Sequence, residues 1–566
     1  MFISIITTLF LGSVIGVITS VSVYGFISLV KILTNIFRNP ENSFNSFYGL
    51  FENTLEFILF VIITPFLIGL VVGIIRKYAS DSRWHGPPDV ILAVHSEKKP
   101  LDIKSGFLTS FSSILSISAG GSVGQYGPLV HFGATLGAEI NDLFKRKGQY
   151  QIYVGAGVAA AISSGFGAPL AGLIFAREVI LRHQSLASFA PILVSSIISY
   201  LFTKNFFGLE PLFSSKIGEI ESIHHFPFFI ISGILCGAIS ILYMRGLTHP
   251  KYFPDISKIN PILQPALAGL ICGLVALYLP QVIGLGTQTI KDLVIGNFDL
   301  KFALTLLLFK LLLTVICLRM GLIGGVFAPA LFLGACIGVI LGIVFQTLSP
   351  NLNTSLLTVA SMSAFASCVI GGPVANMMII LELTSDYQAT LAAGISIVFA
   401  SLVSYKVIGQ SVFDKVLANK NIDLDLGREN IKLQQTLISE ICHKDYCEVT
   451  STSSIENAIK KMVKSKNSEA YLINSEKKIT NKLELPFLLS LKNKKQLVTK
   501  IPKTTFLKLY STENILDSIE KCKTFVGESI PVVSKGGFLE GVVTEGDLFQ
   551  IFLKITKEEK KMEHEN

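Results

Sequence analysis

The chain has 566 residues, of which 50% are hydrophobic and 16% are charged, and its mean hydropathy is +0.58. Soluble domains carry about 25% charged residues, so this composition excludes an ordinary soluble protein. The net charge of +8 reflects short basic loops, and the sequence has no basic and aromatic stripe of the kind that binds nucleic acid. We therefore expect a membrane protein without a nucleic-acid partner.

Apolar runs of about 18–25 residues recur from residue 1 to about residue 418, and such runs are long enough to cross a bilayer. The first run has neither a basic start nor a small-residue cleavage site, which favours a retained helix over a signal peptide. Basic loops at 76–83, 98–104 and 145–147 are typical of the cytoplasmic side. The segments predicted to span the membrane alone are about 3–30, 55–76, 226–247, 262–280 and 302–319.

Three further apolar helices follow segments rich in glycine and proline: "HGPPDV" (85–90), "GSVGQYGP" (121–128) and "GGVFAP" (324–329). Interrupted helices inside a membrane occur where the freed backbone groups face protein or a wet cavity. The first amides of a helix lack partners and carry about half a positive charge, so several helix starts aimed at one point bind an anion. The sequence thus predicts an anion site at the helix starts near Gly86, Gly124 and Gly325.

Two pairs of motifs recur about 200 residues apart and in the same order. "GSVGQYGPLVHFGATLGAEI" is similar to "GLIGGVFAPALFLGACIGVI", and "GFGAPLAGLIFAREV" is similar to "CVIGGPVANMMIILELT". We expect two homologous halves, about 1–205 and 225–418, of the inverted kind found in transporters. For either pair alone, the alternative is the general recurrence of small residues in packed membrane helices.

Glu178 and Glu382 hold corresponding places in the two halves. A carboxylate inside a membrane is by default a candidate for function. Both residues lie near helix ends that are followed by polar residues, so we expect them to cap the amides of neighbouring loops.

The chain becomes polar and charged after residue 418. We expect a linker over 419–436, an α/β domain with two βαβ-type repeats over 437–556 and a charged tail over 557–566. The second repeat is the clearer one, because "IPVVSKGGFLEGVVTEGDLF" indicates two strands joined by a Gly-Gly turn and followed by a helix. "CHKDYC" lacks a second pair of ligands, so no metal site is predicted, and the thiols suit a reducing cytoplasm.

The ordered motifs resemble those of the CLC family of chloride channels and proton–chloride antiporters. "GSVGQYGP" is similar to the family's "GREGP" loop, "GGVFAP" to its "GxFxP" loop and "HGPPD" to its "GSGIPE" loop, while "APLAGLIFAREV", "LELTSDY" and "SVFDKVL" resemble further family helices. The resemblance implies an all-α polytopic membrane domain over 1–418, a homodimer with one pathway per subunit, and chloride or a similar small anion as substrate. It also implies a transport protein that is not an enzyme and requires no cofactor.

The resemblance assigns roles to the two central loops. The backbone amides of Val326 and Phe327 correspond to donors to a central anion. Those of the segment 124–127, which comprises Gly124, Gln125, Tyr126 and Gly127, correspond to donors to an outer anion.

Both proton-handling glutamates of the family's antiporters are replaced. The gating glutamate falls at Tyr126, and the arginine before it falls at Gln125; the inner glutamate falls at Val179, as in channel members of the family. A tyrosine has an ordinary pKa near 10, so it stays neutral where a glutamate would exchange protons. We expect Tyr126 to plug, line or narrow the pathway.

Two hydroxyl ligands of the central anion are also replaced. The family's serine falls at His85 and its tyrosine at Phe413. A histidine ring can still donate a hydrogen bond, whereas phenylalanine cannot. His85 as a loop-packing residue and Phe413 as a core residue are the alternatives.

These departures favour a passive anion channel or uncoupled transporter. The alternatives are a proton-coupled antiporter with an atypical proton path and a membrane sensor or scaffold with a non-conducting pore. The resemblance places the protein in a bacterial inner membrane with its tail in the cytoplasm, and the sequence does not specify which anion is preferred.

The tail resembles the CBS domain pair that many CLC proteins carry. In "VVTEGD", Thr544 and Asp547 match the CBS residues that lie near the phosphate and the ribose of a nucleotide. The first repeat lacks this pattern. An adenine nucleotide at the pair and a purely structural, dimerising role are both left open.

Overall fold

In the computed structural model the chain divides into two compact units, Met1–Asn421 and Ile422–Glu565, which are described separately. The predicted linker over 419–436 lies mostly outside the described residues. The structure describes residues 2–38, 54–96, 101–145, 149–182, 186–208, 217–218, 220, 222–249, 251, 256, 258–296, 298–409, 411–420, 422, 430, 432–434 and 436–565.

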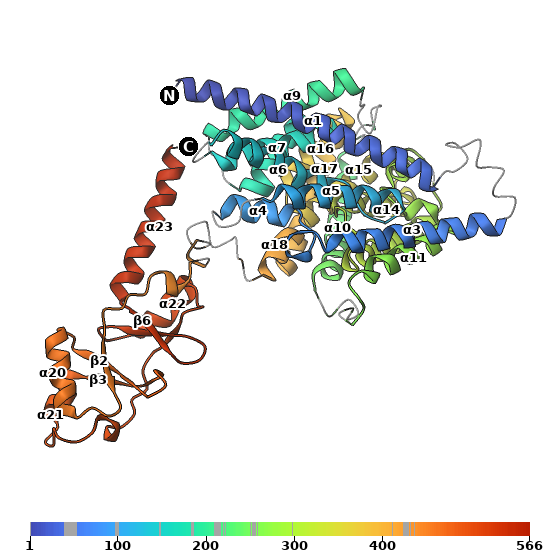
Figure 1. Ribbon diagram of the computed structural model, residues 1–566. Helices are drawn as coiled ribbons and strands as arrows, with labels where there is room; N and C mark the ends of the chain where they lie inside the picture. Colours follow the sequence, from blue (N-terminus) through green and yellow to red (C-terminus); the bar gives the residue numbers. More distant parts are fainter. Residues whose placement is uncertain are drawn as a thin grey trace. The chain divides into compact units, whose positions relative to one another are not determined.

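The first unit consists of helices (Figure 1). Within the described residues, seven segments are long and apolar enough to cross a membrane. The long helices are α1 (Phe2–Arg38), α3 (Thr54–Arg76), α9 (Leu186–Phe207), α10 (Phe226–Thr248), α13 (Leu300–Arg319), α14 (Phe327–Gln346) and α17 (Tyr387–Ile408). The predicted spans at 3–30, 55–76, 226–247 and 302–319 fall in α1, α3, α10 and α13.

Shorter helices make up the rest of this unit. They are α4 (Pro87–His95), α5 (Ile103–Ser118), α6 (Tyr126–Leu143), α7 (Tyr150–Phe166), α8 (Pro169–Phe175), α11 (Leu263–Ala276), α12 (Thr287–Ile295), α15 (Thr354–Ile370), α16 (Pro373–Thr384) and α18 (Val412–Ala418). Short 3₁₀ or π turns occur at η1 (Ser80–Ser82), η2 (Ala176–Leu181), η3 (Ile223–His225) and η5 (Pro280–Val282). The predicted span at 262–280 is instead the 14-residue helix α11, which at about 1.5 Å per residue is too short to cross alone.

Glycines four residues apart let neighbouring helices approach closely. On α6, Gly133 and Gly137 face α7, and a Cβ at Gly137 would lie 2.0 Å from the carbonyl oxygen of Tyr153. On α14, Gly334 and Gly338 face α15, where a Cβ at Gly338 would lie 2.4 Å from Thr358 Cα. The two helices that start at the glycine-rich loops, α6 and α14, therefore each pack closely against the following helix through a pair of glycines four residues apart.

Two glutamates, one in each half of the membrane unit, each cap a helix of the other half. Glu178, in η2, accepts hydrogen bonds from the amides of Val374 (3.1 Å) and Ala375 (2.7 Å) at the start of α16. Glu382, in α16, accepts from the amides of Leu170 (2.9 Å) and Ala171 (2.8 Å) at the start of α8. The carboxylates cap backbone amides, as predicted, but these amides lie at helix starts in the other half and not in neighbouring loops. Their negative charge is suited to helix N-termini.

The second unit contains two small three-stranded sheets. One has the order β1 (Cys447–Thr450), β2 (Glu469–Ile473), β3 (Ile479–Glu484), and the other has the order β4 (Leu509–Tyr510), β5 (Ile530–Val533), β6 (Leu539–Val543). In each sheet the first pair of strands is parallel and the second is antiparallel. The parallel pairs are joined by α20 (Ile455–Ser465) and α22 (Ile515–Lys521), which gives two βαβ units.

Each sheet is followed by a helix, α21 (Leu485–Ser490) or α23 (Glu545–Glu565), and the unit also contains the single turns η6 (Ile438–Glu440), η7 (Val498–Lys500) and η8 (Cys522–Thr524). Each βαβ unit has its own buried apolar cluster. The helix α23 continues well past residue 556, where the domain was predicted to end, so the predicted charged tail begins as part of this helix.

Candidate functional site

The two glycine-rich loops of the first unit bind each other. The amide of Gly124 donates to the carbonyl of Gly325 (2.7 Å), and the amide of Gly325 donates to the carbonyl of Gly124 (2.5 Å). A Cβ at Gly325 would lie 2.6 Å from the amide nitrogen of Gly127, so this approach requires glycine. Because the amide of Gly124 is occupied by this bond, the free donors of its loop begin at residue 125.

Two helices start directly after this pair of bonds. α6 begins at Tyr126 after the N-cap Gln125, and α14 begins at Phe327 after the N-cap Val326. The first amides of each helix have no partner within the helix. Their partial positive charges therefore gather where the two loops meet, which is the arrangement that binds an anion without a full positive charge.

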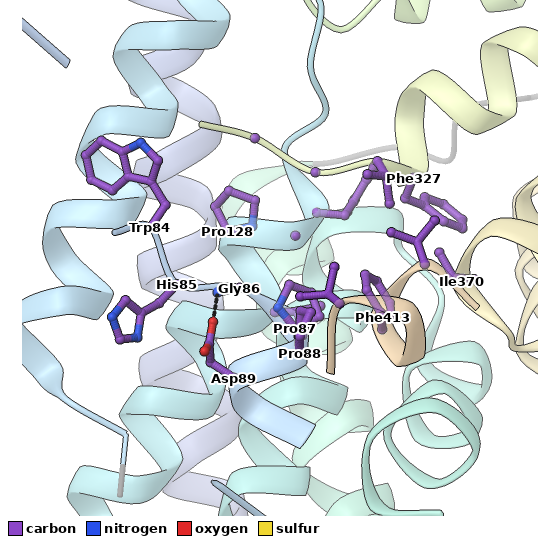
Figure 2. Close-up of a pocket in the computed structure, with 18 of the residues that line it drawn as sticks. Trp84, His85, Gly86, Pro87, Pro88, Asp89, Pro128, Phe327, Ile370 and Phe413 are labelled. Atoms are coloured by element: carbon purple, nitrogen blue, oxygen red, sulfur yellow. Dashed lines mark hydrogen bonds between the residues drawn. The ribbon is translucent and has the colours of Figure 1, made fainter. Parts of the chain in front are cut away.

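A cavity of about 380 Å³ opens beside these helix starts. Its walls come from the starts of α4, α6, α14 and α18, and Figure 2 shows Phe327, Phe413, Pro87 and Pro88 around the same space. The predicted site residues that line it are His85, Gly86, Tyr126, Gly127, Val326, Phe327 and Phe413. Gly124 and Gln125 are not on its wall among the described residues.

Three aromatic rings form one cluster in this cavity. The ring of Tyr126 stacks on that of Phe166, with centroids 3.6 Å apart, and meets Phe327 edge-on at 5.8 Å. Phe166 and Phe327 are also edge-on, at 5.3 Å. The hydroxyl of Tyr126 donates to the carbonyl of Gly165 (3.4 Å). These ring contacts and the hydrogen bond fix the side chain of Tyr126 on the cavity wall. Phe166 is a contributor that the sequence motifs did not reveal.

The described acid on the cavity wall is Asp89, and it is already paired. Its carboxylate lies 2.8 Å from the guanidinium of Arg83 and 3.5 Å from the ammonium of Lys420, and it accepts a hydrogen bond from the amide of Gly86 (3.0 Å). Two cations against one carboxylate leave this end of the cavity with a net positive charge, which attracts anions.

Two predicted positions, His85 and Val179, lie apart from the cavity's centre. His85 is on the wall, but its Nε2 lies 3.2 Å from the carbonyl of Ser80, and Figure 2 shows its ring turned away from Phe327 and Phe413. The predicted hydrogen bond to an anion therefore competes with a backbone partner. Val179 is buried in η2, where it packs against Gly372, and it is not on the cavity wall.

A second cavity of about 710 Å³ meets the same loop. Its wall includes Gln125, whereas the next residue, Tyr126, lines the first cavity. Lys31 and Arg38 of α1 supply two cations, Asp292 supplies one carboxylate, and the segment 280–289 supplies amides and hydroxyls. The loop before α6 therefore lies between an apolar space and a polar, basic one.

A buried lysine supports the wall of the second cavity. Lys310 of α13 has no exposed surface, and its Nζ donates to the carbonyls of Val282 and Gly284, both at 2.9 Å. The hydroxyl of Ser122 donates to the same Val282 carbonyl (2.9 Å), so the lysine and the glycine-rich loop hold one segment. Among the described residues no carboxylate lies within ion-pair distance of Lys310. A lone lysine in an apolar span was the available sequence signal.

The predicted nucleotide residues of the tail bond to each other. Asp547 accepts from the amide (2.8 Å) and the hydroxyl (2.7 Å) of Thr544 and lies 3.2 Å from Nε2 of His443. Burial raises the pKa of the Asp547 carboxyl, but the hydrogen bonds from Thr544 and the charge of His443 outweigh it, so the pKa lies below its usual value. One carboxylate oxygen therefore already has three partners within the protein.

Similar proteins share this architecture. The chain is 26% identical over 414 residues to the voltage-gated ClC-type chloride channel ClcB of Escherichia coli O17:K52:H18, which covers 72% of this chain and 97% of that protein. The crystal structure of a slow cyanobacterial Cl⁻/H⁺ antiporter aligns with a TM-score of 0.65 and 22% identity over 73% of this chain and 97% of its own. A eukaryotic CLC transporter aligns with a TM-score of 0.64 and 17% identity, over 97% of this chain and 99% of its own.

The family model described as "Voltage gated chloride channel" matches residues 66–405, which is more than half of the chain. The matched region contains both glycine-rich loops, the helix starts that follow them and the two exchanged glutamate caps. The chain therefore belongs to the voltage-gated chloride channel family.

Proposed function

We propose that the protein is a passive anion channel or uncoupled anion transporter of the CLC type, with chloride or a similar small anion as its substrate. The anion passes the paired loops at Gly124 and Gly325 and is held by the free amides at the starts of α6 and α14. Transport of this kind requires binding strong enough to admit the ion and weak enough to release it, which backbone dipoles provide.

The observation that carries this proposal is the state of the acids around the pathway. Proton exchange needs a carboxylate that can change partners. Asp89 is paired with Arg83 and Lys420, and Glu178 is occupied by two backbone amides. The family's gating position holds Tyr126, whose hydroxyl is bonded to a backbone carbonyl. No free carboxylate is therefore left on the described wall of the first cavity to carry protons.

Proteoliposome flux tests the proposal. Liposomes loaded with chloride and given a potassium ionophore should release chloride at a rate set by the protein, while an external pH electrode records no proton movement. Chloride-driven proton uptake that a protonophore abolishes would establish the coupled alternative. A folded protein without flux would establish the non-conducting alternative. Of the two alternatives, the ring stack at Tyr126 favours the non-conducting pore over the proton-coupled antiporter.

For the second unit we propose a cytoplasmic CBS pair that assists assembly of a homodimer. Two βαβ units of matching topology and the full-length alignment with a eukaryotic CLC transporter support this assignment. A structural role is favoured over nucleotide binding, because Asp547 is already occupied by Thr544 and His443. Calorimetry with ATP, ADP and AMP tests this choice, and we expect no heat of binding.

A further inference from the structure

The helix α5 carries a stripe of hydroxyl groups along one face. Ser105, Thr109, Ser112 and Ser116 follow each other at intervals of four, three and four residues, which places them on the same side of a helix. Ser105 at the first end bonds to Asp102, at 2.8 Å from its hydroxyl. At the other end the hydroxyl of Ser116 accepts from the amide of Ile323 (3.3 Å). Ile323 lies on the wall of the first cavity.

The middle of this stripe lacks partners. The hydroxyls of Thr109 and Ser112, and those of the adjacent Ser110 and Ser113, are buried and have no hydrogen-bond partner among the described residues. Helical serine and threonine commonly bond to the carbonyl four residues earlier, but these four do not. Buried polar groups without a protein partner are usually satisfied by ordered water.

A buried histidine on α6 has the same deficit. His131 has no exposed surface, and neither of its ring nitrogens has a partner among the described residues. A neutral imidazole presents one donor and one acceptor, so two hydrogen-bonding atoms are orphaned in one side chain.

The packing of α5 on α6 brings these groups to one place. A Cβ at Gly106 would lie 3.0 Å from the hydroxyl of Thr135, which fixes where the two helices touch. The helices are joined by a short loop and run in opposite directions, so one turn further along α5 faces one turn earlier along α6. From this register we infer that Thr109 and Ser110 lie opposite His131. The set Thr109, Ser110, Ser112, Ser113 and His131 is called the polar seam below.

The charged surroundings of His131 come from a few elements. His85 lies edge-on to it, with ring centroids 5.8 Å apart. Burial disfavours the charged form of His131; of the nearby charges, Asp89 and Asp102 favour that form, whereas His85 and Arg83 oppose it. The helices α7 and α14, which also pack on α6, carry no acidic or basic residue. Lys31 and Arg38 of α1 lie on the wall of the second cavity, and Lys104 of α5 is exposed.

We propose that water molecules fill the polar seam and that His131 binds a proton delivered through them from the end of α5 at Asp102. The ligands of this site are therefore water and a proton, and the site lies beside the anion pathway. His131 follows Tyr126 by five residues, or about 7.5 Å along the helix axis. At that distance a protonated imidazole attracts an anion held at the start of α6.

Proton and anion binding then strengthen each other by the same factor. The titratable groups on the wall of the first cavity are held in other contacts, Asp89 by Arg83 and Lys420 and His85 by the carbonyl of Ser80. We therefore expect the proton to bind and return to the same side, without net proton transport. This inference uses the proposed anion site as its readout. Proton movement in the liposome assay would overturn the passive function and leave the proton site intact.

Calorimetry on the full-length protein in detergent tests the coupling. Because burial disfavours the protonated ring of His131 until the solution is acidic, the dissociation constant for chloride should fall by at least about fivefold between pH 7 and about pH 4. The variant His131→Gln keeps a donor and an acceptor but does not titrate, so its affinity should not change with pH. An unchanged pH profile in a folded His131→Gln protein would overturn the proposal, as would a flat profile in the wild type that retains anion binding.

A second measurement keeps the proposal open to refutation if His131→Gln does not fold. Hydroxyl-radical footprinting with X-rays labels side chains that touch bound water. His131 should be oxidised in the wild-type protein although it is buried, and the double variant Thr109→Val, Ser112→Ala should reduce that oxidation at least about threefold, since it removes two of the partners that hold the water. Absence of oxidation at His131 in the wild type would exclude the water-filled seam.

Discussion

The two cavities of the membrane unit meet at one loop and differ in character. The first, of about 380 Å³, is lined by aromatic rings, prolines and the starts of helices, whereas the second, of about 710 Å³, is lined by amides, hydroxyls and two cations of α1. The change occurs between consecutive residues, since Gln125 lines the second and Tyr126 the first. In the proposed pathway an anion is thus collected in a polar space and then depends on backbone amides in an apolar one.

This contrast between the two cavities separates the attraction of anions from their selection. Lys31 and Arg38 act at a distance and raise the local anion concentration. The helix starts at Tyr126 and Phe327 act only on an ion that has lost water. Substitutions at the loop between the cavities should therefore have larger effects than substitutions on either wall.

The largest effect is expected where the loops bind each other. Gly325→Ala places a Cβ 2.6 Å from the amide nitrogen of Gly127 and breaks two backbone hydrogen bonds worth about 1 kcal/mol each, so chloride flux should fall more than about tenfold. Gly25→Ala in α1 is the matched control, because its Cβ would meet no atom within 4 Å. Equal flux from the two variants would show that the paired loops do not shape the pathway.

The next effect concerns the ring stack. Tyr126→Ala removes aromatic contacts worth about 0.5–1.5 kcal/mol per pair, so chloride flux should rise about threefold to tenfold. Tyr126→Phe keeps the stack on Phe166 and loses only the bond to Gly165, so its flux should stay within about twofold of wild type, because the ring stays in place. A rise of the same size in both variants would assign the barrier to the hydroxyl group and not to the ring.

A smaller effect is expected behind the second cavity. Lys310→Met removes one donor from each of the carbonyls of Val282 and Gly284 and leaves the first with Ser122 alone, which should lower the unfolding free energy by about 1–3 kcal/mol. The fluorescence of Trp84, the single tryptophan, reports unfolding of this unit because its indole bonds to Gly321. Lys31→Met on the cavity wall is the control, with a change within about 0.5 kcal/mol. Equal changes in unfolding free energy in the two variants would mean that Lys310 contributes no more to stability than Lys31.

The smallest effect lies in the tail. The pKa of Asp547 is held below its usual value, so its contribution to stability is present above about pH 4 and is lost as pH falls through the lowered pKa. Hydrogen exchange of the full-length protein should show faster exchange at the start of α23 at acidic pH. Asp547→Asn should remove this pH dependence and leave chloride flux unchanged. A pH dependence that persists in the variant would assign it to another group.

The glycine-rich loops and the exchanged glutamate caps could be predicted from sequence because their signals are local. Gly, Pro and small residues mark helix starts, and a carboxylate near a helix end indicates a cap. The same pattern occurs twice, at Glu178 and Glu382, which made the expectation specific.

The contacts that set the character of each cavity could not be predicted in this way. Tyr126 and the carbonyl of Gly165 are 39 positions apart in the chain, and Ser116 and Ile323 are 207 apart. Such pairs depend on how helices from different parts of the sequence pack. For the same reason the sequence suggested His85 as an anion ligand, whereas in the fold its ring reaches Ser80.

The reversal potential under a proton gradient tests the central claim most directly. With a fixed chloride gradient across the liposome membrane, the potential at which net flux vanishes should equal the chloride equilibrium value. It should not move when the two sides differ by about one pH unit, because the described wall of the first cavity offers no free carboxylate for proton exchange. A shift of the reversal potential toward the proton equilibrium value would contradict the account, since it would require protons to move with the anion past Tyr126.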